Sequence, residues 1–317
     1  MLPSPQSPLH LDRRWACLLL AMLAVAAYAG TLGNGFVFDD RAVIASDSTA
    51  PTFRSLPSFL TAPYWTGEGR ANRLYRPLTS VSFALNEILG GARPWTFHLV
   101  NLLLHALVSI ILYLLLVRLF GEGTLPLAAA ALFCVHPLLS EAVAGVVGRS
   151  ELFSALFMLA ARWVERPPPR AGRGRGATAS FFPPILFFLA LLSKENALAY
   201  PAVSWLTDKV LGPPKGADRR RRAWEMSALL GTAVVYLMLR KMVLGTLMEP
   251  GSIPEVDNPL AHVSAASRIA TAFTLLLRYV GLFLFPLRLS ADYSSPQILP
   301  LKGLGDLGVI FSAAVIA

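Results

Sequence analysis

Long uncharged apolar runs constrain this chain more than any other feature. The run from Trp15 to Leu32 carries no charge and approaches the roughly 20 residues that a helix needs to cross a bilayer. A second run, Thr96 to Val117, is interrupted only by His98, Asn101 and His105. Since 55% of the residues are hydrophobic and only 15% are charged, the sequence predicts an all-α polytopic membrane protein.

Further apolar segments follow along the chain. They are Leu125 to Val135, Leu152 to Val164, Phe181 to Leu192, Ala197 to Leu206, Ala228 to Leu239, Ile269 to Leu289 and Leu307 to Ala317. Several are too short to span a bilayer alone, and Pro or charged residues interrupt them, so we expect broken or re-entrant helices. The last run reaches the end of the sequence, which raises the expectation that the chain is a fragment.

Positive charge orients the predicted spans, because short loops rich in Lys and Arg stay in the cytoplasm. The sequence has three basic patches, Arg13-Arg14, 162–175 and 209–222. All three lie on the same side of the membrane if segments 125–164 and 181–209 each form a hairpin that enters and leaves the membrane. We therefore expect cytoplasmic basic loops at 165–178 and 209–223 within one transmembrane domain. The alternative, one long helix over 181–211, would export an arginine run and is disfavoured.

This topology gathers the other charged segments on the exported side. They are Asp39-Asp40, residues 136–151, Lys194-Glu195 and residues 245–267. The first exported loop, 34–95, contains a half-apolar stretch from Leu78 to Leu89, which we interpret as a helix lying on the membrane surface. Orientation also explains the net charge of +9, because no nucleic-acid motif accompanies the basic loops.

The N-terminal region resembles a signal peptide, because Arg13-Arg14 and an apolar core precede Ala27-Tyr28-Ala29. The many spans that follow favour an uncleaved first helix instead. Cys17 and Cys134 lie within apolar runs, which predicts buried thiols rather than a disulfide or a metal pair.

Charged groups at a membrane edge are costly and are therefore candidates for function. Asp39 and Asp40 are equipped for base chemistry or for metal binding, although no clear third metal ligand accompanies them. Arg76 is suited to hold a phosphate or a carboxylate by two parallel hydrogen bonds, and snorkelling to headgroups is its alternative.

Three polar residues share one face of the second span, because His98, Asn101 and His105 are three and four residues apart. Such a stripe more often forms hydrogen bonds between helices than it performs chemistry. A catalytic or ligand role is the alternative.

The segment 136–151 carries several candidates. Pro137 is placed to begin a helix, on which Glu141, Gly145 and Gly148 would share a face that another helix or a lipid chain can approach. No Ser-His-Asp order, P-loop, dinucleotide fingerprint or zinc spacing occurs, which argues against soluble-type nucleotide enzymes.

Further charged candidates lie near the predicted exported edge. Arg149 and Glu151 form either a structural pair or a substrate contact, and His136 is more often structural than a ligand. Lys194 and Glu195 need partners if they are buried, and we expect these among Glu151, Arg149 and the aspartates. Lys194 is equally suited to an anionic phosphate.

Together these short polar and charged segments resemble the membrane part of the transmembrane and tetratricopeptide-repeat (TMTC) O-mannosyltransferases. The matching residues are Phe36 to Asp40, Tyr75 to Leu78, Phe97 to Asn101 with His105, His136-Pro137 with Glu141 to Val143 and Gly148-Arg149, Ser193 to Glu195, and Pro286 to Ser294. Each segment alone is weak evidence for the family, but the six segments occur in order over nearly the whole chain.

The resemblance implies a GT-C-like helix bundle with dolichyl-phosphate-mannose protein O-mannosyltransferase activity. Mannose would pass from a polyprenyl (dolichyl) phosphate to Ser or Thr hydroxyls of an exported protein, with the lipid-linked sugar, the acceptor protein and the bilayer as partners. Asp39 or Asp40 would be the catalytic carboxylate, and Arg76, Arg149 or Lys194 would stabilise the phosphate. The supporting residues would be His98, Asn101, His105, His136, Glu141, Glu151 and Glu195.

The chain departs from this family in one respect, because no 34-residue helical repeat is present in residues 1–317. The residues assign neither a cofactor nor a divalent metal. The membrane would be that of the endoplasmic reticulum in a eukaryote and the inner cell membrane in a bacterium. A non-catalytic scaffold and a multi-span transporter are the alternative functions. Asp292-Tyr293 would be cytoplasmic by parity unless the preceding segment re-enters.

Overall fold

The computed structural model of the protein describes residues 11–44, 51–64, 74–166, 181–213, 219–246, 258–287, 289–290, 298–301 and 303. Every regular element within these ranges is a helix, which confirms the predicted all-α class. The chain divides into two compact units, Met1–Leu247 and Met248–Ala317.

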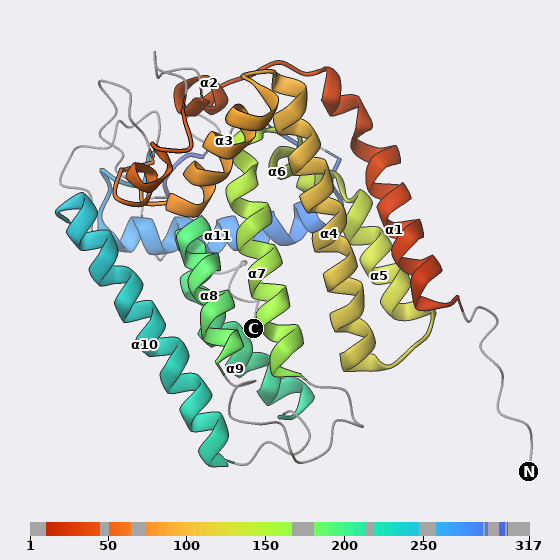
Figure 1. The fold of residues 1–317 in the computed structure, drawn as a ribbon. Helices are drawn as coiled ribbons and strands as arrows, with labels where there is room; N and C mark the ends of the chain where they lie inside the picture. The colour runs from red at the N-terminus through yellow and green to blue at the C-terminus, as the bar shows by residue number, and fades with distance from the viewer. Residues whose placement is uncertain are drawn as a thin grey trace, which may run out of the picture. The chain divides into compact units, whose positions relative to one another are not determined.

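The first unit contains the helices α1 to α10 of Figure 1. Their bounds are Arg13–Tyr28 (α1), Asp39–Ile44 (α2), Pro77–Gly90 (α3), Pro94–Phe120 (α4), Thr124–Val135 (α5), Ser140–Ala144 (α6), Arg149–Glu165 (α7), Phe182–Ser193 (α8), Tyr200–Leu211 (α9) and Arg219–Leu244 (α10). Short 3-10 helices lie between them at Ala29–Gly33 (η1), Leu56–Leu60 (η2), Pro137–Leu139 (η3), Val146–Gly148 (η4) and Glu195–Ala199 (η6).

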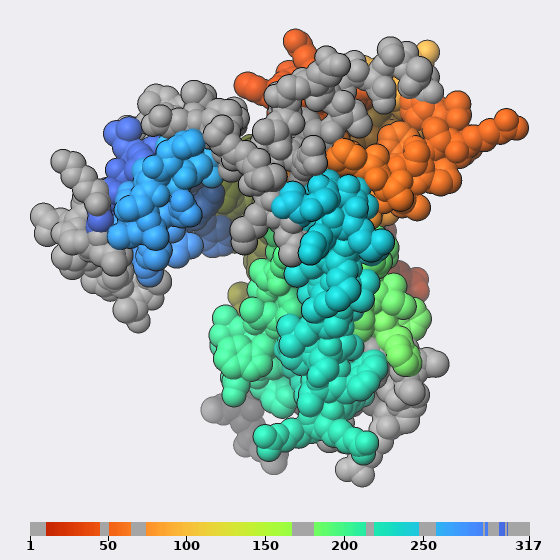
Figure 2. Space-filling model, turned by 90° about the vertical axis from the view of Figure 1, so that its left-hand side faces the viewer, coloured from red at the N-terminus to blue at the C-terminus, as the bar shows by residue number. Residues whose placement is uncertain are grey.

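Several of these helices are suited to cross a membrane. Arg13–Gly33, α4 and α10 are long and apolar enough to do so singly, whereas α5 and Pro137–Ala144 pass the same test together with a bend of 49°. The predicted polytopic class and the predicted broken helices are therefore confirmed. Figure 2 shows α10 running along the surface of its unit. Its exposed side chains include the apolar Leu230, Val234, Val235, Met238 and Met242.

The sequence of α4 explains its length. Pro94 occupies the first turn, where a missing N–H costs nothing, and no other Pro and no Gly occur before Phe120. Gly121 follows with φ 89°, a left-handed conformation that stops the helix. The structure also forms α3 over the stretch that was predicted to be an interfacial helix.

One end of the first unit, here called the basic end, collects the predicted cytoplasmic charges. Arg13 at the start of α1 pairs with Glu122 after α4, with 2.6 Å between nitrogen and oxygen. Arg118 in the last turn of α4 donates to the carbonyl oxygen of Arg166, just after α7, at 3.1 Å. The start of α1 and the ends of α4 and α7 therefore lie together.

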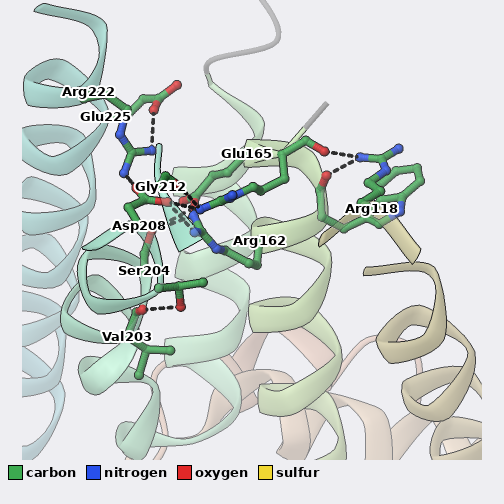
Figure 3. A network of polar contacts seen from close by, with 12 residues as sticks. Arg118, Arg162, Glu165, Val203, Ser204, Asp208, Gly212, Arg222 and Glu225 are labelled. Carbon is green, nitrogen blue, oxygen red and sulfur yellow. Dashed lines mark hydrogen bonds and ion pairs between the residues drawn. The ribbon is translucent and has the colours of Figure 1, made fainter. Parts of the chain in front are cut away.

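Asp208 of α9 extends the basic end (Figure 3). It pairs with Arg166 at 2.6 Å and also with Arg162 of α7 and Arg222 of α10. Arg162 in turn pairs with Glu165 at 2.7 Å. The last turn of α9 and the first turn of α10 thus join the last turn of α7.

These contacts fix the direction of each helix in the first unit. Phe181 at the start of α8 lies edge-on to Trp224 of α10, with ring centroids 5.4 Å apart, so α8 begins at the basic end and α9 ends there. Segments 125–164 and 181–209 each fold back as helical hairpins, as predicted, and their passage into and out of a membrane stays a prediction. The continuous helix over 181–211 is excluded, because Lys194 is extended with φ −157° and ψ 138°.

The packing of α1 against α4 and α5 relies on small residues. Ala16, Leu20 and Ala24 recur every four residues and are completely buried in one apolar cluster. Helices in lipid gain little from hiding apolar surface from water, so close contact between backbones stabilises the pair. Cys134 of α5 lies in the same cluster and is a buried free thiol, as predicted. Cys17 is also a free thiol but is only half-buried.

The predicted single helix after Pro137 is wrong. Gly145 is extended, with φ −78° and ψ 132°, and separates α6 from η4, so Glu141, Gly145 and Gly148 do not share a helical face. A Cβ on Gly148 would lie 2.3 Å from the carbonyl oxygen of Ala142. The close approach that the glycines indicated therefore involves the chain's own backbone.

The second unit is described around one helix, α11 (Ala265–Leu284), which is also long and apolar enough to span a membrane. The Ser264 side chain caps it by accepting a hydrogen bond from the Ser267 backbone N–H at 3.2 Å. Asp292-Tyr293, the run from Leu307 and most of the loop 165–178 lie outside the described residues.

Candidate active site

The end of the first unit opposite the basic end carries most of the predicted site residues, and we call it the site end. It brings α2, η4, the start of α7 and the Lys194-Glu195 break into contact through polar side chains. The predicted clustering of Asp39-Asp40, residues 136–151 and Lys194-Glu195 is confirmed by the contacts described below.

Asp40 is a buried carboxylate held by backbone groups. It is 1% exposed, and its Oδ1 accepts a hydrogen bond from the Val147 N–H of η4 at 2.9 Å. Its Oδ2 accepts from the Val37 N–H at 3.3 Å. Because both oxygens are occupied, Asp40 ties the first loop to the start of α7.

Asp39 has a more open environment than its neighbour. It is the first residue of α2 and is half-buried. Phe38, just before it, has φ 44°, a conformation unusual for a side chain of this size. The two adjacent carboxylates therefore differ in accessibility, which the sequence did not reveal.

Arg149 is completely buried at the start of α7 and binds only neutral oxygens among the described residues. Its Nε donates to Asn101 Oδ1 at 3.0 Å, and one terminal nitrogen donates to Asn86 Oδ1 at 2.8 Å and to the Phe97 carbonyl at 3.0 Å. The other terminal nitrogen donates to the Ser82 carbonyl at 3.2 Å. This geometry favours a role in joining α3, α4 and α7 over direct phosphate contact.

The polar stripe of α4 forms hydrogen bonds between elements. Asn101 donates to the Gly145 carbonyl at 2.9 Å while it accepts from Arg149, and His105 Nε2 lies 2.8 Å from the Cys134 carbonyl. His98 is completely buried beside the backbone of Gly35. Asn101 and His105 therefore support the structural interpretation of this stripe, whereas neither ring nitrogen of His98 has a hydrogen-bond partner among the described residues.

Two further candidates also occupy structural positions. The Nδ1 of His136 accepts from the Leu138 N–H at 3.2 Å and caps η3. Glu141 lies exposed in the first turn of α6.

Arg76 and Glu195 form the best-oriented ion pair of the site end. Arg76 Nε lies 3.0 Å from one carboxylate oxygen and a terminal nitrogen lies 2.7 Å from the other, so the pair is bidentate. Burial alone would raise the pKa of the Glu195 carboxyl, but the hydrogen bonds and charge of Arg76 hold it below its ordinary value. The predicted use of Arg76 for a carboxylate is thus observed within the chain.

Lys194 pairs with Glu151, which was one of its predicted partners. Asn196 donates to the same carboxylate at 3.2 Å and accepts from Ser154 at 3.2 Å. Arg149 and Glu151, which the sequence suggested as a pair, are therefore engaged separately. The Lys194 and Glu151 side chains are 21% and 40% exposed, so this pair is accessible to a ligand.

Tyr64 was missed by the sequence analysis. The Arg76 guanidinium lies over its ring at 5.2 Å, and burial raises the pKa of Tyr64, opposed by Arg76 and assisted by Asp39 and Asp40. Tyr64 thus connects the acidic and cationic parts of the site end. Its loop carries no periodic signal, so only the fold reveals it. Among the described residues no group of three or more His, Cys, Asp or Glu side chains is placed to hold a metal ion.

Comparison with known proteins identifies clear relatives. Protein O-mannosyl-transferase Tmtc2 of Drosophila melanogaster is 34% identical over 309 residues, which cover 92% of this chain and 32% of the relative. Protein O-mannosyl-transferase TMTC4 of Homo sapiens is 30% identical over 345 residues, covering 95% and 46%. TMTC3 of Mus musculus, also named a protein O-mannosyl-transferase, is 40% identical over 146 residues, covering 45% and 16%.

The first two of these alignments cover nearly the whole of this chain but only part of each relative. The chain spans about a third to a half of the length of the relatives that match it end to end. Neither a family model nor a solved structure matches the chain.

Proposed function

Because the chain belongs to the family of the TMTC protein O-mannosyl-transferases over the part of those proteins that it spans, we propose that it is the membrane part of a glycosyltransferase. It would move mannose from a polyprenyl (dolichyl) phosphate to Ser or Thr hydroxyls of exported proteins. The observation that carries this proposal is that the half-buried Asp39 lies at the same end as Arg76 and Lys194.

Asp39 is the carboxylate suited to act on the acceptor. In the reaction, the hydroxyl oxygen bonds to the anomeric carbon of mannose while the bond from that carbon to the phosphate oxygen breaks. Asp39 takes the hydroxyl proton, because a hydroxyl is a poor nucleophile near neutral pH. Asp40 has both oxygens occupied by backbone N–H groups and serves to hold the loop that carries Asp39.

Lys194 and Arg76 are the cations suited to the donor phosphate. A phosphate leaving group gains negative charge, which a nearby cation stabilises. Lys194 is the more accessible of the two and exchanges Glu151 for phosphate most readily, whereas the bidentate pair of Arg76 is better shielded. Arg149 supports the site from its buried position.

The apolar helix faces suit the lipid part of the donor. The outward face of α10 carries exposed leucine, valine and methionine side chains. A polyprenyl chain lies along such a surface within the hydrocarbon layer. The membrane is that of the endoplasmic reticulum if the protein is eukaryotic and the inner cell membrane if it is bacterial.

The test is mannose transfer in membranes that contain the full-length protein. Labelled mannose is supplied on a polyprenyl phosphate together with a Ser/Thr-containing peptide, and membranes without the protein serve as the baseline. We expect labelled peptide only where the protein is present, and no labelling when the peptide lacks Ser and Thr. No transfer above baseline from mannose or other polyprenyl-linked sugars would contradict the proposal and favour a non-catalytic scaffold.

A further inference from the structure

The turn before Asp39 has a backbone conformation that phenylalanine rarely adopts. Phe38, at φ 44°, is the only non-glycine residue with positive φ among the described residues. In this left-handed region the Cβ crowds the following carbonyl group, a cost that glycine avoids. The sequence therefore keeps an aromatic ring where glycine would suit the backbone better.

The Phe38 side chain itself gains little packing against the described residues that would offset this cost. The Phe38 residue is 78% exposed. Phe36, two residues earlier, points the other way and meets Phe97 edge-on, with ring centroids 5.4 Å apart. A strained and exposed aromatic residue directly beside a candidate catalytic group indicates that its ring acts on something outside the chain.

The turn is held firmly, so the position of the ring is constrained. The Asp40 N–H donates to the Val37 carbonyl at 2.9 Å, and the Asp40 carboxylate accepts from the Val37 N–H. The Arg41 side chain donates to the Phe36 carbonyl at 2.9 Å. A group presented by a fixed turn loses little conformational freedom when a ligand binds.

We propose that the Phe38 ring binds the acceptor polypeptide beside the hydroxyl that Asp39 activates. This inference rests on the proposed function. An apolar ring offers nothing to the donor phosphate, for which Arg76 and Lys194 are available. The polyprenyl chain favours the hydrocarbon layer, whereas Phe38 lies in the loop that follows the first span. Peptide planes and apolar side chains near the target Ser or Thr are the groups that such a ring covers.

Substitutions at position 38 distinguish the effect of the aromatic ring from the effect of the backbone conformation. Phe38→Ala removes the ring and keeps the strain, Phe38→Gly removes both, and Phe38→Tyr keeps the ring. We expect the first two to raise the KM for a Ser/Thr peptide by about tenfold and Phe38→Tyr to leave it within about twofold. The donor KM stays unchanged in all three. Phe53→Ala is the matched control, because Phe53 is an exposed phenylalanine of the same loop.

An unchanged peptide KM in Phe38→Ala and Phe38→Gly, with transfer itself continuing, would overturn the inference.

Photocrosslinking gives a second readout that does not need turnover. Benzoylphenylalanine at position 38 is irradiated in the full-length protein with a biotinylated Ser/Thr peptide, and position 53 is the control. We expect a peptide adduct at position 38 that unlabelled peptide competes away. Adducts to lipid alone would overturn the inference and show that the ring contacts the membrane. Equal peptide adducts at both positions would show that the peptide does not bind specifically at position 38.

Discussion

At the scale of single residues, the surroundings of a side chain decide what its chemistry can do. Asp39 and Asp40 are adjacent and identical in type, yet Asp39 is half-buried, whereas Asp40 is buried and accepts backbone hydrogen bonds on both oxygens. Arg76 and Arg149 differ in the same way, because Arg76 has a carboxylate partner and Arg149 is surrounded by neutral oxygens. Arg149 therefore organises the site end without balancing a neighbouring charge.

The Arg149→Lys substitution tests this organising role. A lysine keeps the charge but lacks the planar guanidinium that donates to Asn86, Asn101 and the two carbonyl oxygens at once. We expect a loss of about 2–4 kcal/mol in the free energy of unfolding, since each buried oxygen left without a donor costs about 1–3 kcal/mol. Denaturation of the purified protein in detergent measures this loss. Arg54→Lys, at an exposed arginine, should cost less than about 0.5 kcal/mol. Equal effects of the two substitutions would refute the organising role.

At the scale of elements, breaks in the helices create the site. The extended residue Lys194 separates α8 from η6 and α9, and it turns the next carboxylate, Glu195, toward Arg76 before α3. Gly145 similarly separates α6 from η4 and lets the Val147 N–H reach Asp40. Each break places a polar group at the site end that a straight helix would have kept within its own hydrogen bonds.

The Arg76–Glu195 pair predicts how stability depends on pH. The folded-state pKa of Glu195 lies below its ordinary value, so the pair stabilises the fold fully above the unfolded-state pKa of about 4.3. That contribution is lost as pH falls from there through the folded-state pKa. Unfolding midpoints measured between neutral pH and acid should fall less steeply for Glu195→Gln than for the wild type. Parallel curves for the two proteins would mean that this pair contributes nothing.

Hydrophobic patterns predicted most of these elements, but not the contacts between the charges. The spans, both hairpins and the Lys194–Glu151 pair could be predicted, because apolar length and charge placement are properties of the sequence itself. The Arg76–Glu195 pair joins residues 119 positions apart, and the Tyr64 contact depends on an irregular loop. The prediction of a single helix after Pro137 was wrong, because the backbone turns back at this point and brings Gly148 against the backbone of Ala142.

At the scale of the whole molecule, the first unit has two chemically distinct ends. The basic end joins α7, α9 and α10 through Asp208 and its arginines (Figure 3), and α1 and α4 through Arg13 and Arg118. The site end carries Asp39, Asp40, Glu151 and Glu195 with the cations Arg76 and Lys194. Lys and Arg in short loops favour the cytoplasmic side. With the basic end assigned to the cytoplasm by this rule, the prediction remains that Asp39 faces the exported side.

Cysteine labelling tests this orientation. In a background with Cys17 and Cys134 replaced by alanine, Arg54→Cys and Arg220→Cys each place one exposed thiol at opposite ends. In sealed vesicles of known orientation, we expect an impermeant maleimide to label position 54 only from the exported side. Position 220 should react only from the cytoplasmic side. Labelling of both from the same side would refute the topology.

The central claim is that Asp39 performs chemistry while Asp40 holds its loop. The most direct measurement compares mannose transfer and thermal unfolding for Asp39→Asn and Asp40→Asn in the same preparation. The account predicts that Asp39→Asn lowers transfer by about 100-fold or more at an unchanged unfolding midpoint. Asp40→Asn should lower the midpoint, because one backbone N–H loses its acceptor. Wild-type transfer by Asp39→Asn, with loss of transfer in a fully stable Asp40→Asn, would contradict it.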